Sequence, residues 1–190
     1  MIMANLFYII GASGAGKDSL IQYIREIMPD DVPVVFAHRY ITRPADAGGE
    51  NHVALGVQEF LLREQQGCFA MKWYSHDTYY GVGMEVNEWL DRGLDVIVNG
   101  SREYLIEADQ RYSNLVPVLI SVDQEVLHDR LIARGRETDE QINKRLIQAA
   151  RLDKEINHPD LLKLENNSSI EDAGGHLLNL ILNKVSEKCA

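Results

Sequence analysis

The residues that decide the fold read Gly11-Ala12-Ser13-Gly14-Ala15-Gly16-Lys17, in a chain of 190 residues. They match the pattern G-x-x-x-x-G-K of phosphate-binding loops, or P-loops. The apolar run Leu6–Ile10 before them predicts a buried strand. The residues after them predict a helix that begins at Gly16 and stops near Pro29. This strand, loop and helix context disfavours the alternative, a Gly-rich turn with an accidental lysine.

The chemistry of this stretch suits the phosphates of ATP. The glycines let the backbone turn so that successive N–H groups point at one anion, and the helix N-terminus adds partial positive charge. A lysine at the end of the loop reaches the β- and γ-phosphates. The predicted ATP-binding residues of the loop are Gly11, Ala12, Ser13, Gly14, Ala15, Gly16, Lys17, Asp18 and Ser19.

Asp18 departs from the motif, whose last position is normally a Ser or Thr that ligates Mg²⁺. As a hard oxygen ligand, Asp18 suits Mg²⁺ directly or through water. Alternatively, it is a helix N-terminal acid favoured by the helix dipole, and both interpretations stay open. The apolar run Val96–Asn99 ends in an amide where P-loop enzymes often place an aspartate. We hypothesise that the carboxylate missing at Asn99 has been relocated to Asp18.

Composition narrows the class of ligand and the compartment. The net charge of −10 argues against a nucleic-acid surface but not against small anionic ligands. No apolar run approaches the ~20 residues of a membrane span, and no basic region precedes the first apolar stretch. Cys68 and Cys189 have no metal-ligand or CxxC spacing and are expected to be free thiols. We therefore expect a cytoplasmic protein without nucleic-acid or membrane partners.

Strands and helices alternate along the whole chain, which predicts a single α/β domain over residues 1–190, a P-loop NTPase fold. The expected sheet is mostly parallel and flanked by helices, with ligands at the carboxyl ends of its strands. The predicted strands are Leu6–Ile10, Val34–Ile41, Val96–Asn99, Val116–Val122 and Leu161–Leu164. After the first helix, others are predicted at Val57–Gln66, Glu85–Arg92, Arg102–Tyr112, Gln124–Arg134, Gln141–Leu152 and from Ile170 to Val185.

Polar side chains for an anionic acceptor follow the second predicted strand. Arg39 and Arg43 lie at its carboxyl end, and a guanidinium pairs bidentately with phosphate. The alternative is a surface salt bridge with nearby acids. Further on, the phenol of Tyr80 suits a phosphate oxygen, whereas Trp73 is expected to pack in the core. His38, His52 and His76 are assigned no catalytic role; contact with the sugar and a structural role are equally open for His38 and His52.

Arginines crowd the region after the fourth strand, with Gly135 as a flexible point between two helical stretches. They are Arg130, Arg134, Arg136, Arg145 and Arg151. This pattern is typical of a mobile lid that brings positive charge over a transferring group. The alternative, helix-surface arginines paired with nearby acids, is expected to hold for some of them.

The order of the P-loop, Thr42-Arg43-Pro44, Tyr79-Tyr80-Gly81 and the arginine-rich region is similar to that of guanylate kinases. The base-reading positions differ. Met71 stands where guanylate kinases carry a carboxylate, Val82 where they carry Ser or Thr, and Asp46 where they carry a second phosphate-binding arginine. A purine edge without these contacts would stay unpaired, so guanylate kinase activity is not expected.

A closer resemblance is to the ribose 1,5-bisphosphate phosphokinase family of phosphonate catabolism. It is carried by the motifs GKDSL (16–20), AHRYITR (37–43), ENHVAL (50–55), YYGVG (79–83) and VNGSR (98–102). The resemblance runs nearly end to end and implies transfer of the ATP γ-phosphoryl to the 1-phosphate of ribose 1,5-bisphosphate, giving 5-phosphoribosyl 1-diphosphate. It also implies Mg²⁺ as the cofactor.

The resemblance extends the expected site. It implies an acceptor-binding insertion at about 38–84 and a lid at about 134–145, which carries Arg134 and Arg136 and is followed by Arg145 directed at the phosphates. It places Asn166 beside the adenine, with a helix N-cap at Ser168 or Ser169 as the alternative for this stretch. The expected acceptor-binding residues are Arg39, Arg43, Tyr80, Asn99 and Arg102. The expected catalytic residues are Lys17, Arg145 and Arg136.

Three other functions are compatible with a P-loop in this context. A kinase of another phosphorylated acceptor, such as a nucleoside monophosphate, is the main alternative. A non-catalytic guanylate-kinase-like scaffold and a regulatory nucleotide switch belong to different classes. A scaffold has no need of Gly16-Lys17 or of a charged lid, and lid arginines suit turnover better than signalling.

Overall fold

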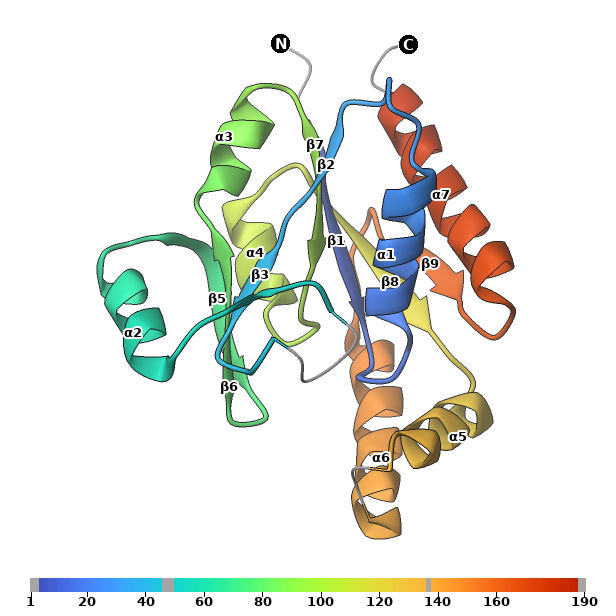
Figure 1. The fold of residues 1–190 in the computed structure, drawn as a ribbon. Helices are drawn as coiled ribbons and strands as arrows, with labels where there is room; N and C mark the ends of the chain where they lie inside the picture. The colour runs from blue at the N-terminus through green and yellow to red at the C-terminus, as the bar shows by residue number, and fades with distance from the viewer. Residues whose placement is uncertain (1–3, 46–49, 136–137, 188–190) are drawn as a thin grey trace.

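The computed structural model describes residues 4–45, 50–135 and 138–187, which form two sheets with helices around them (Figure 1). The larger sheet has five strands in the order β2-β7-β1-β8-β9, and all its pairings are parallel. Its strands are β1 (Leu6–Gly11), β2 (Val34–Phe36), β7 (Asp95–Asn99), β8 (Leu115–Ser121) and β9 (Leu162–Glu165). The predicted parallel α/β sheet is therefore confirmed.

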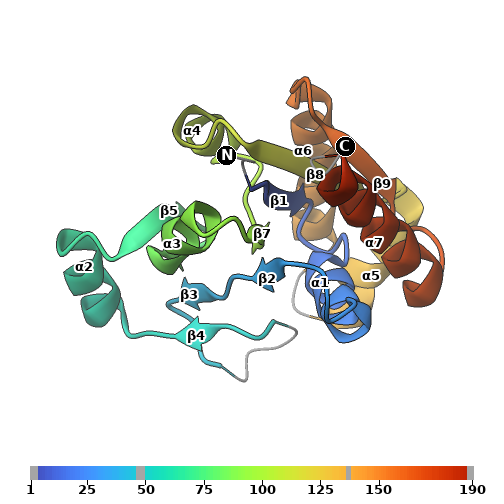
Figure 2. The ribbon, with the colours of Figure 1, turned by 90° about the horizontal axis from the view of Figure 1, so that it is seen from above.

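Alternation along β1 explains why both faces of this sheet are covered. Phe7 and Ile9 point to one face and pack in a cluster with residues of α1 (Lys17–Ile27) and α7 (Ile170–Ser186). Tyr8 and its even-numbered neighbours point to the other face, toward α3 (Glu85–Asp91) and α4 (Leu105–Arg111). Figure 2 shows these helix pairs on opposite sides of the sheet. A strand buried on both faces must be apolar throughout, as β1 is.

The second sheet has four strands in the order β4-β3-β6-β5 and corrects one prediction. The segment Val34–Ile41, predicted as a single strand, is divided between the sheets. Its first part is β2, paired with β7, and its last part is β3 (Arg39–Ile41), paired antiparallel with β6 (Thr78–Gly83). Ala37 N–H still donates to the Ile97 carbonyl in the first sheet, at 2.9 Å, whereas Arg39 is already paired in the second sheet. The chain therefore passes from one sheet to the other at Ala37 and His38.

The rest of the second sheet is a hairpin and a short edge strand that the pattern of apolar residues did not predict. β5 (Phe69–Ser75) and β6 are joined by a two-residue turn at His76 and Asp77, both with positive φ. The edge strand β4 (Val53–Ala54) pairs parallel with β3, and α2 (Val57–Gln65) leads from it to the hairpin. These segments all fall within the predicted insertion, residues 38–84.

The remaining helices extend beyond the carboxyl ends of the large sheet. They are α5 (Gln124–Arg134) and α6 (Asp139–Glu155), which lie together in Figure 1. A capping box begins α6: Thr138 Oγ1 accepts from Gln141 N–H, and Gln141 Oε1 accepts from Thr138 N–H at 2.9 Å. The predicted helix thus begins two residues earlier, at Asp139. The predicted helix from Arg102 begins later, at Leu105, which leaves Arg102 in a loop.

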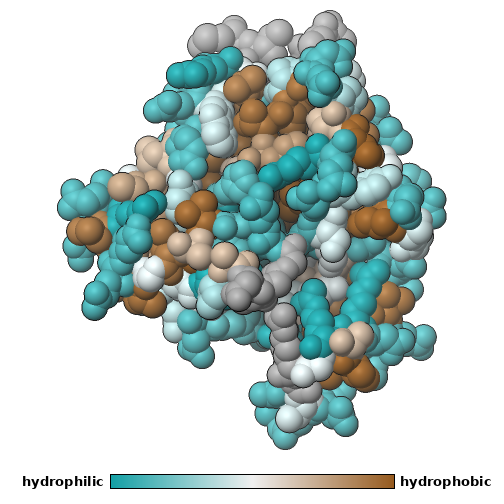
Figure 3. Space-filling model, in the orientation of Figure 1, coloured by the Kyte–Doolittle hydropathy of each residue, from teal (hydrophilic) through white to brown (hydrophobic). Residues whose placement is uncertain are grey.

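Hydrophilic residues predominate on the face seen in Figure 3, with hydrophobic patches between them. Ile132 of α5 and Ile147 of α6 are among the exposed large hydrophobic residues. Among the described residues, no helix is both long and apolar enough to cross a membrane.

Candidate active site

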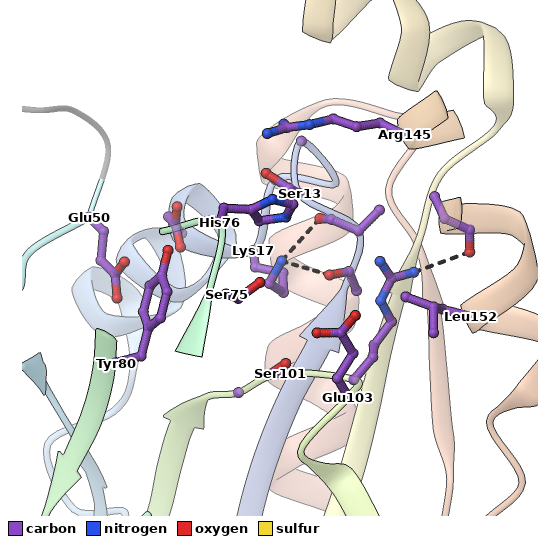
Figure 4. A pocket seen from close by; sticks show the side chains of 18 of the residues that line it. Ser13, Lys17, Glu50, Ser75, His76, Tyr80, Ser101, Glu103, Arg145 and Leu152 are labelled. Carbon is purple, nitrogen blue, oxygen red and sulfur yellow. Dashed lines mark hydrogen bonds between the residues drawn. The ribbon is translucent and has the colours of Figure 1, made fainter. Parts of the chain in front are cut away.

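A cavity of about 320 Å³ lies at the carboxyl ends of β1 and β7, as predicted for a parallel sheet (Figure 4). Four parts of the chain line it: the P-loop, the loop after β7, the second sheet with Glu50, and α6 with the end of α5. From the P-loop, the lining residues are Gly11, Ala12, Ser13, Gly14, Gly16, Lys17, Asp18 and Ser19. The predicted loop residue Ala15 is buried beneath them, 1% exposed.

Two glycines of the P-loop are required by its geometry. Gly14 and Gly16 have φ values of 102° and 89°, which side chains disfavour. A Cβ on Gly14 would lie 2.9 Å from Leu127 of α5, and one on Gly16 would collide with the amide of Asn166. The loop therefore lies against its own protein on the inner side and turns its outer side to the cavity.

Lys17 lies folded over the loop. Its Nζ donates to the carbonyls of Gly11 and Ala12 at 2.9 and 3.0 Å, drawn as dashed lines in Figure 4. Burial lowers the pKa of the Lys17 ammonium to about 8, against a smaller opposing effect of Asp18. An anion in the cavity would offset this loss of hydration, so the geometry favours a phosphate beside Lys17.

Asp18 and Asn99 meet across the first sheet's carboxyl edge. Asn99 Nδ2 donates to Asp18 Oδ1 at 2.6 Å, although 81 residues separate them. Asn99 is 6% exposed, and its Oδ1 is buried without a hydrogen-bond partner among the described residues. Asn99 itself is not among the cavity-lining residues, so it contacts the site through Asp18.

The donor set suits a metal held mainly by the substrate. The Asp18 side chain is 35% exposed and lines the cavity beside Ser19. Within the described ranges, no group of three or more His, Cys, Asp or Glu side chains is arranged to hold a metal ion. Mg²⁺ is commonly bound through one or two carboxylates together with substrate phosphates and water, and the residues present fit that arrangement.

On the acceptor side, Arg39 is bound to Glu50. Arg39 Nε donates to Glu50 Oε1 at 2.5 Å, and its NH2 group donates to Oε2. Arg43 lies 3.8 Å from the same carboxylate, and Asp18 lies 3.9 Å from Arg39. Burial, the largest single effect, lowers the pKa of Arg39, but the hydrogen bonds and charge of Glu50 together with Asp18 and Tyr80 raise it overall. Both predicted arginines line the cavity, and their partner Glu50 was not predicted as a site residue.

Aromatic rings form the wall behind these arginines. Trp73 and Tyr80 stack with centroids 5.5 Å apart and planes at 4°, and Tyr104 continues the stack on Trp73 at 5.8 Å. The Arg39 guanidinium lies 5.1 Å from the Tyr80 ring centroid. Tyr80 lines the cavity as predicted. Trp73 packs against the core as predicted and also lines the cavity.

The three histidines occupy different positions. His52 is buried, and its two ring nitrogens contact the backbone carbonyls of Glu50 and Arg43, at 3.0 and 3.2 Å. His38 Nε2 lies 3.2 Å from Arg25 and from Asn51, both of which are donors, so it accepts and the imidazole is neutral. Burial and then the charge of Arg25 lower its pKa accordingly. His76, at the hairpin tip, lines the cavity (Figure 4).

The lid region faces the P-loop from the other side. Arg134, at the end of α5, and Arg145, of α6, line the cavity, and Arg145 extends across the top of the loop in Figure 4. Arg136 lies outside the described residues. Arg102 also lines the cavity but is bound to α6: its NH1 donates to Asp153 Oδ1 at 2.5 Å and to the Ala149 carbonyl at 3.1 Å.

Asn166, predicted to border the adenine, is bound to the backbone of the P-loop. It is 4% exposed and does not line the cavity. Its Nδ2 donates to the Ala15 carbonyl at 2.7 Å, and Arg130 NH2 donates to the Asn166 carbonyl at 3.0 Å. Asn166 therefore supports the P-loop from beneath. The alternative for the following residues is confirmed, because Ser169 caps α7 by accepting from Asp172 N–H.

Eight cavity-lining residues were missed by sequence reasoning. Half of them are in loops, Glu50, Gly100, Ser101 and Glu103; Ser75 ends β5, and Gln148, Ala149 and Leu152 are on α6. VNGSR and ENHVAL, two of the motifs above, contained three of them, Gly100, Ser101 and Glu50, yet no single residue type marked them. Their contribution depends on which segments the fold brings together.

Comparison with models of known protein families gives no match. Among solved structures, the guanylate kinase of Anaplasma phagocytophilum is similar over 96% of this chain and 86% of its own, with a TM-score of 0.72 and 16% identity. A gluconokinase from Sinorhizobium meliloti gives a TM-score of 0.52 at 15% identity, over 98% and 97% of the two chains. Fold and site together define a P-loop protein with the guanylate kinase fold.

Curated relatives are far more similar in sequence. The ribose 1,5-bisphosphate phosphokinase PhnN of Psychromonas ingrahamii is 51% identical over 95% of this chain and 91% of its own. The protein of the same name from Thiobacillus denitrificans is 48% identical over 100% and 99% of the two chains. The chain belongs to the ribose 1,5-bisphosphate phosphokinase family.

Proposed function

We propose that this protein is a kinase that transfers the γ-phosphoryl group of ATP to the 1-phosphate of ribose 1,5-bisphosphate, forming 5-phosphoribosyl 1-diphosphate. The relatives named above carry this activity in their names, at about half identity over nearly the whole chain. The P-loop supports binding of a nucleoside triphosphate, and the arginines opposite it support a phosphorylated acceptor.

The observation that carries the choice of acceptor concerns Met71 and Val82. These residues stand where guanylate kinases place their guanine-reading carboxylate and hydroxyl. Here both side chains are fully buried, 0% exposed, and pack in the hydrophobic cluster on the α3 and α4 face of the large sheet. Neither side chain lines the cavity, so neither offers a hydrogen bond to a purine edge, which disfavours a nucleotide acceptor.

The reaction needs positioning and charge more than covalent help. An oxygen of the acceptor's 1-phosphate attacks the γ-phosphorus, the bond from that phosphorus to the β–γ bridging oxygen breaks, and ADP leaves with that electron pair. The attacking phosphate oxygen is already anionic near neutral pH, so no general base is required. Lys17 stabilises charge on the transferring group from the P-loop. Arg145 does so from α6, and Arg136 is proposed to assist from the lid.

The remaining residues position the two substrates. The P-loop and Arg134 hold ATP, while Arg39, Arg43, Tyr80 and Arg102 bind the acceptor, with Asn99 acting through Asp18. Mg²⁺ is proposed to be held by Asp18, directly or through water. When bound, the ion neutralises charge on the phosphates of ATP.

The test is ADP release by purified protein with ATP and Mg²⁺ and a panel of acceptors: ribose 1,5-bisphosphate, GMP, AMP and gluconate. Turnover with ribose 1,5-bisphosphate, and 5-phosphoribosyl 1-diphosphate as its product, is the expected result. ADP release confined to GMP would instead assign a guanylate kinase. Absence of release with every acceptor would favour a non-catalytic scaffold. Lys17→Ala is the matched inactive control, and a loss of about 10²–10³ in turnover is expected.

A further inference from the structure

Glu50 is a carboxylate that the transfer of phosphate does not explain. It lines the cavity, and its side chain is 9% exposed. Its negative charge repels phosphate groups, and it is hydrogen-bonded to Arg39, one of the arginines proposed to bind them. Figure 4 shows it entering from the acceptor side, with its carboxylate beside the Tyr80 ring. A buried charge in such a position calls for a ligand that donates hydrogen bonds.

The carboxylate is held in place but not saturated. The Arg39 fork uses one acceptor position on each oxygen, and an ionised carboxylate offers about four in all. The NH2 group of Arg43 lies 3.8 Å from Glu50 Oε2, beyond hydrogen-bond distance. The backbone of Glu50 is fixed as well, because its carbonyl contacts His52 Nδ1 at 3.0 Å. Glu50 is therefore a preorganised acceptor of further hydrogen bonds.

Hydroxyl groups are the donors that the proposed acceptor has to offer. Phosphate oxygens of a sugar bisphosphate accept hydrogen bonds, and its 1- and 5-oxygens are esterified. The 2- and 3-hydroxyls remain, side by side on one edge of the ring. Two adjacent hydroxyls match the two oxygens of one carboxylate, as in other charge-assisted pairs.

We propose that Glu50 reads the vicinal 2- and 3-hydroxyls of the ribose ring and is thereby a specificity-determining residue for the acceptor. The inference rests on the proposed function. Arg39 then has two tasks. Its Nε and NH2 groups orient the Glu50 carboxylate, and its place in the acceptor site holds that carboxylate beside the acceptor phosphate. A polyol phosphate without this diol would leave the remaining acceptor positions of a buried carboxylate unfilled and would bind poorly.

A purely structural role of Glu50, as the counter-ion that positions Arg39, makes a different prediction. In both cases Glu50→Gln weakens use of ribose 1,5-bisphosphate. If Glu50 only positions Arg39, the variant loses the same factor with every acceptor phosphate, whatever hydroxyls the ring carries. If Glu50 reads the diol, the loss depends on the hydroxyls.

The experiment compares kcat/KM for ribose 1,5-bisphosphate with that for its 2-deoxy and 3-deoxy analogues, in the wild type and in Glu50→Gln. The wild type is expected to lose about 10- to 100-fold with each analogue, the range for a hydrogen bond to a charged group. In Glu50→Gln the ratio of ribose to deoxyribose substrate is expected to fall to a few-fold. Glu59→Gln is the control, because it makes the same change in an exposed pair with Arg63 and should keep the wild-type ratio.

Three outcomes would overturn the inference. Equal use of all three acceptors by the wild type does so without any variant, so a folding defect of Glu50→Gln cannot obscure it. An unchanged ratio in Glu50→Gln, with all three activities lowered alike, leaves only a positioning role. No turnover of ribose 1,5-bisphosphate by the wild type overturns the proposed function first and this inference with it.

Discussion

Asn99 donates a hydrogen bond of 2.6 Å from its side-chain amide to the carboxylate of Asp18. The amide ends β7 and the carboxylate begins α1, so the bond ties the large sheet to the first turn after the P-loop. A neutral donor at position 99 orients Asp18 without competing for a cation. An aspartate there would place two carboxylates in contact and repel. This geometry fits the hypothesis that the metal-associated charge has moved from strand to helix.

Asn99→Ala is expected to raise the Mg²⁺ concentration needed for half-maximal activity by about 10- to 100-fold, the usual effect of removing a partner that orients a metal ligand. Titration of activity with Mg²⁺ at saturating ATP measures this. Asp18→Asn should show a larger effect. Asn87→Ala, which truncates an amide bound to Tyr112 on the far side of the sheet, is the control. Unchanged Mg²⁺ dependence in Asp18→Asn would refute the assignment.

The lowered pKa of Lys17 predicts how the use of ATP depends on pH. Burial lowers the pKa of its ammonium to about 8, and only the charged form attracts phosphate. Below pH 8 the free protein carries the charge; as pH rises through 8 it loses the charge, so kcat/KM for ATP should fall about tenfold per pH unit. Binding of ATP should take up a proton near pH 8.5, measurable by calorimetry in buffers of different ionisation enthalpy. Lys17→Arg stays charged and should lack this decline.

A substitution of Asn166 can distinguish a role in supporting the P-loop from a role in recognising the adenine base. Asn166→Ala leaves the Ala15 carbonyl without its buried donor, so a loss of about 1–3 kcal/mol in the free energy of unfolding is expected. Because the defect lies in the loop, the KM values for ATP and GTP should rise by the same factor. Asn167→Ala removes an exposed bond to Asp123 N–H and serves as the neighbouring control. A rise in the KM for ATP alone would instead support the predicted contact of Asn166 with the adenine.

Arg102 joins the loop after β7 to α6. Asp153→Ala removes the partner of a guanidinium that is 10% exposed, and urea unfolding should show a loss of about 1–3 kcal/mol. Glu155→Ala removes the partner of Arg151 two residues further along the same helix, where both side chains are more than half exposed. That change should cost less than about 0.5 kcal/mol. Equal losses of unfolding free energy in the two variants would mean that the pair of Arg102 and Asp153 stabilises α6 no more than an exposed ion pair does.

The large sheet was predictable because each of its central strands can be recognised from its own residues. Strands such as β1, β7 and β8 are continuous apolar runs, and the P-loop marks where the first one ends. The division of Val34–Ile41 was not predictable, since no glycine or proline interrupts the segment and only pairing with β7 and β6 decides where the chain changes sheets. The hairpin was missed because its turn uses His76 and Asp77 instead of the usual glycine or asparagine.

The site divides in the same way. The P-loop and the arginine positions follow from motif and charge, and they line the cavity as expected. Glu50 was missed because its meaning arises only when the chain folds back and brings it to Arg39, 11 residues earlier. The bond of Asn166 to the P-loop was not predicted, because a position after a strand does not reveal which side of the loop it reaches.

The change of partners at Ala37 and His38 has a mechanical consequence. A rigid rotation of the second sheet about that point displaces each residue in proportion to its distance from the pivot. Arg39 comes directly after the pivot, whereas the hairpin tip at His76 and Asp77 lies at the far end of the sheet (Figure 1). A rotation of the second sheet about that point would therefore move His76, which lines the cavity, further than Arg39. It would also have to break the packing of Met71 and Val82 against the large sheet, which holds the two sheets together.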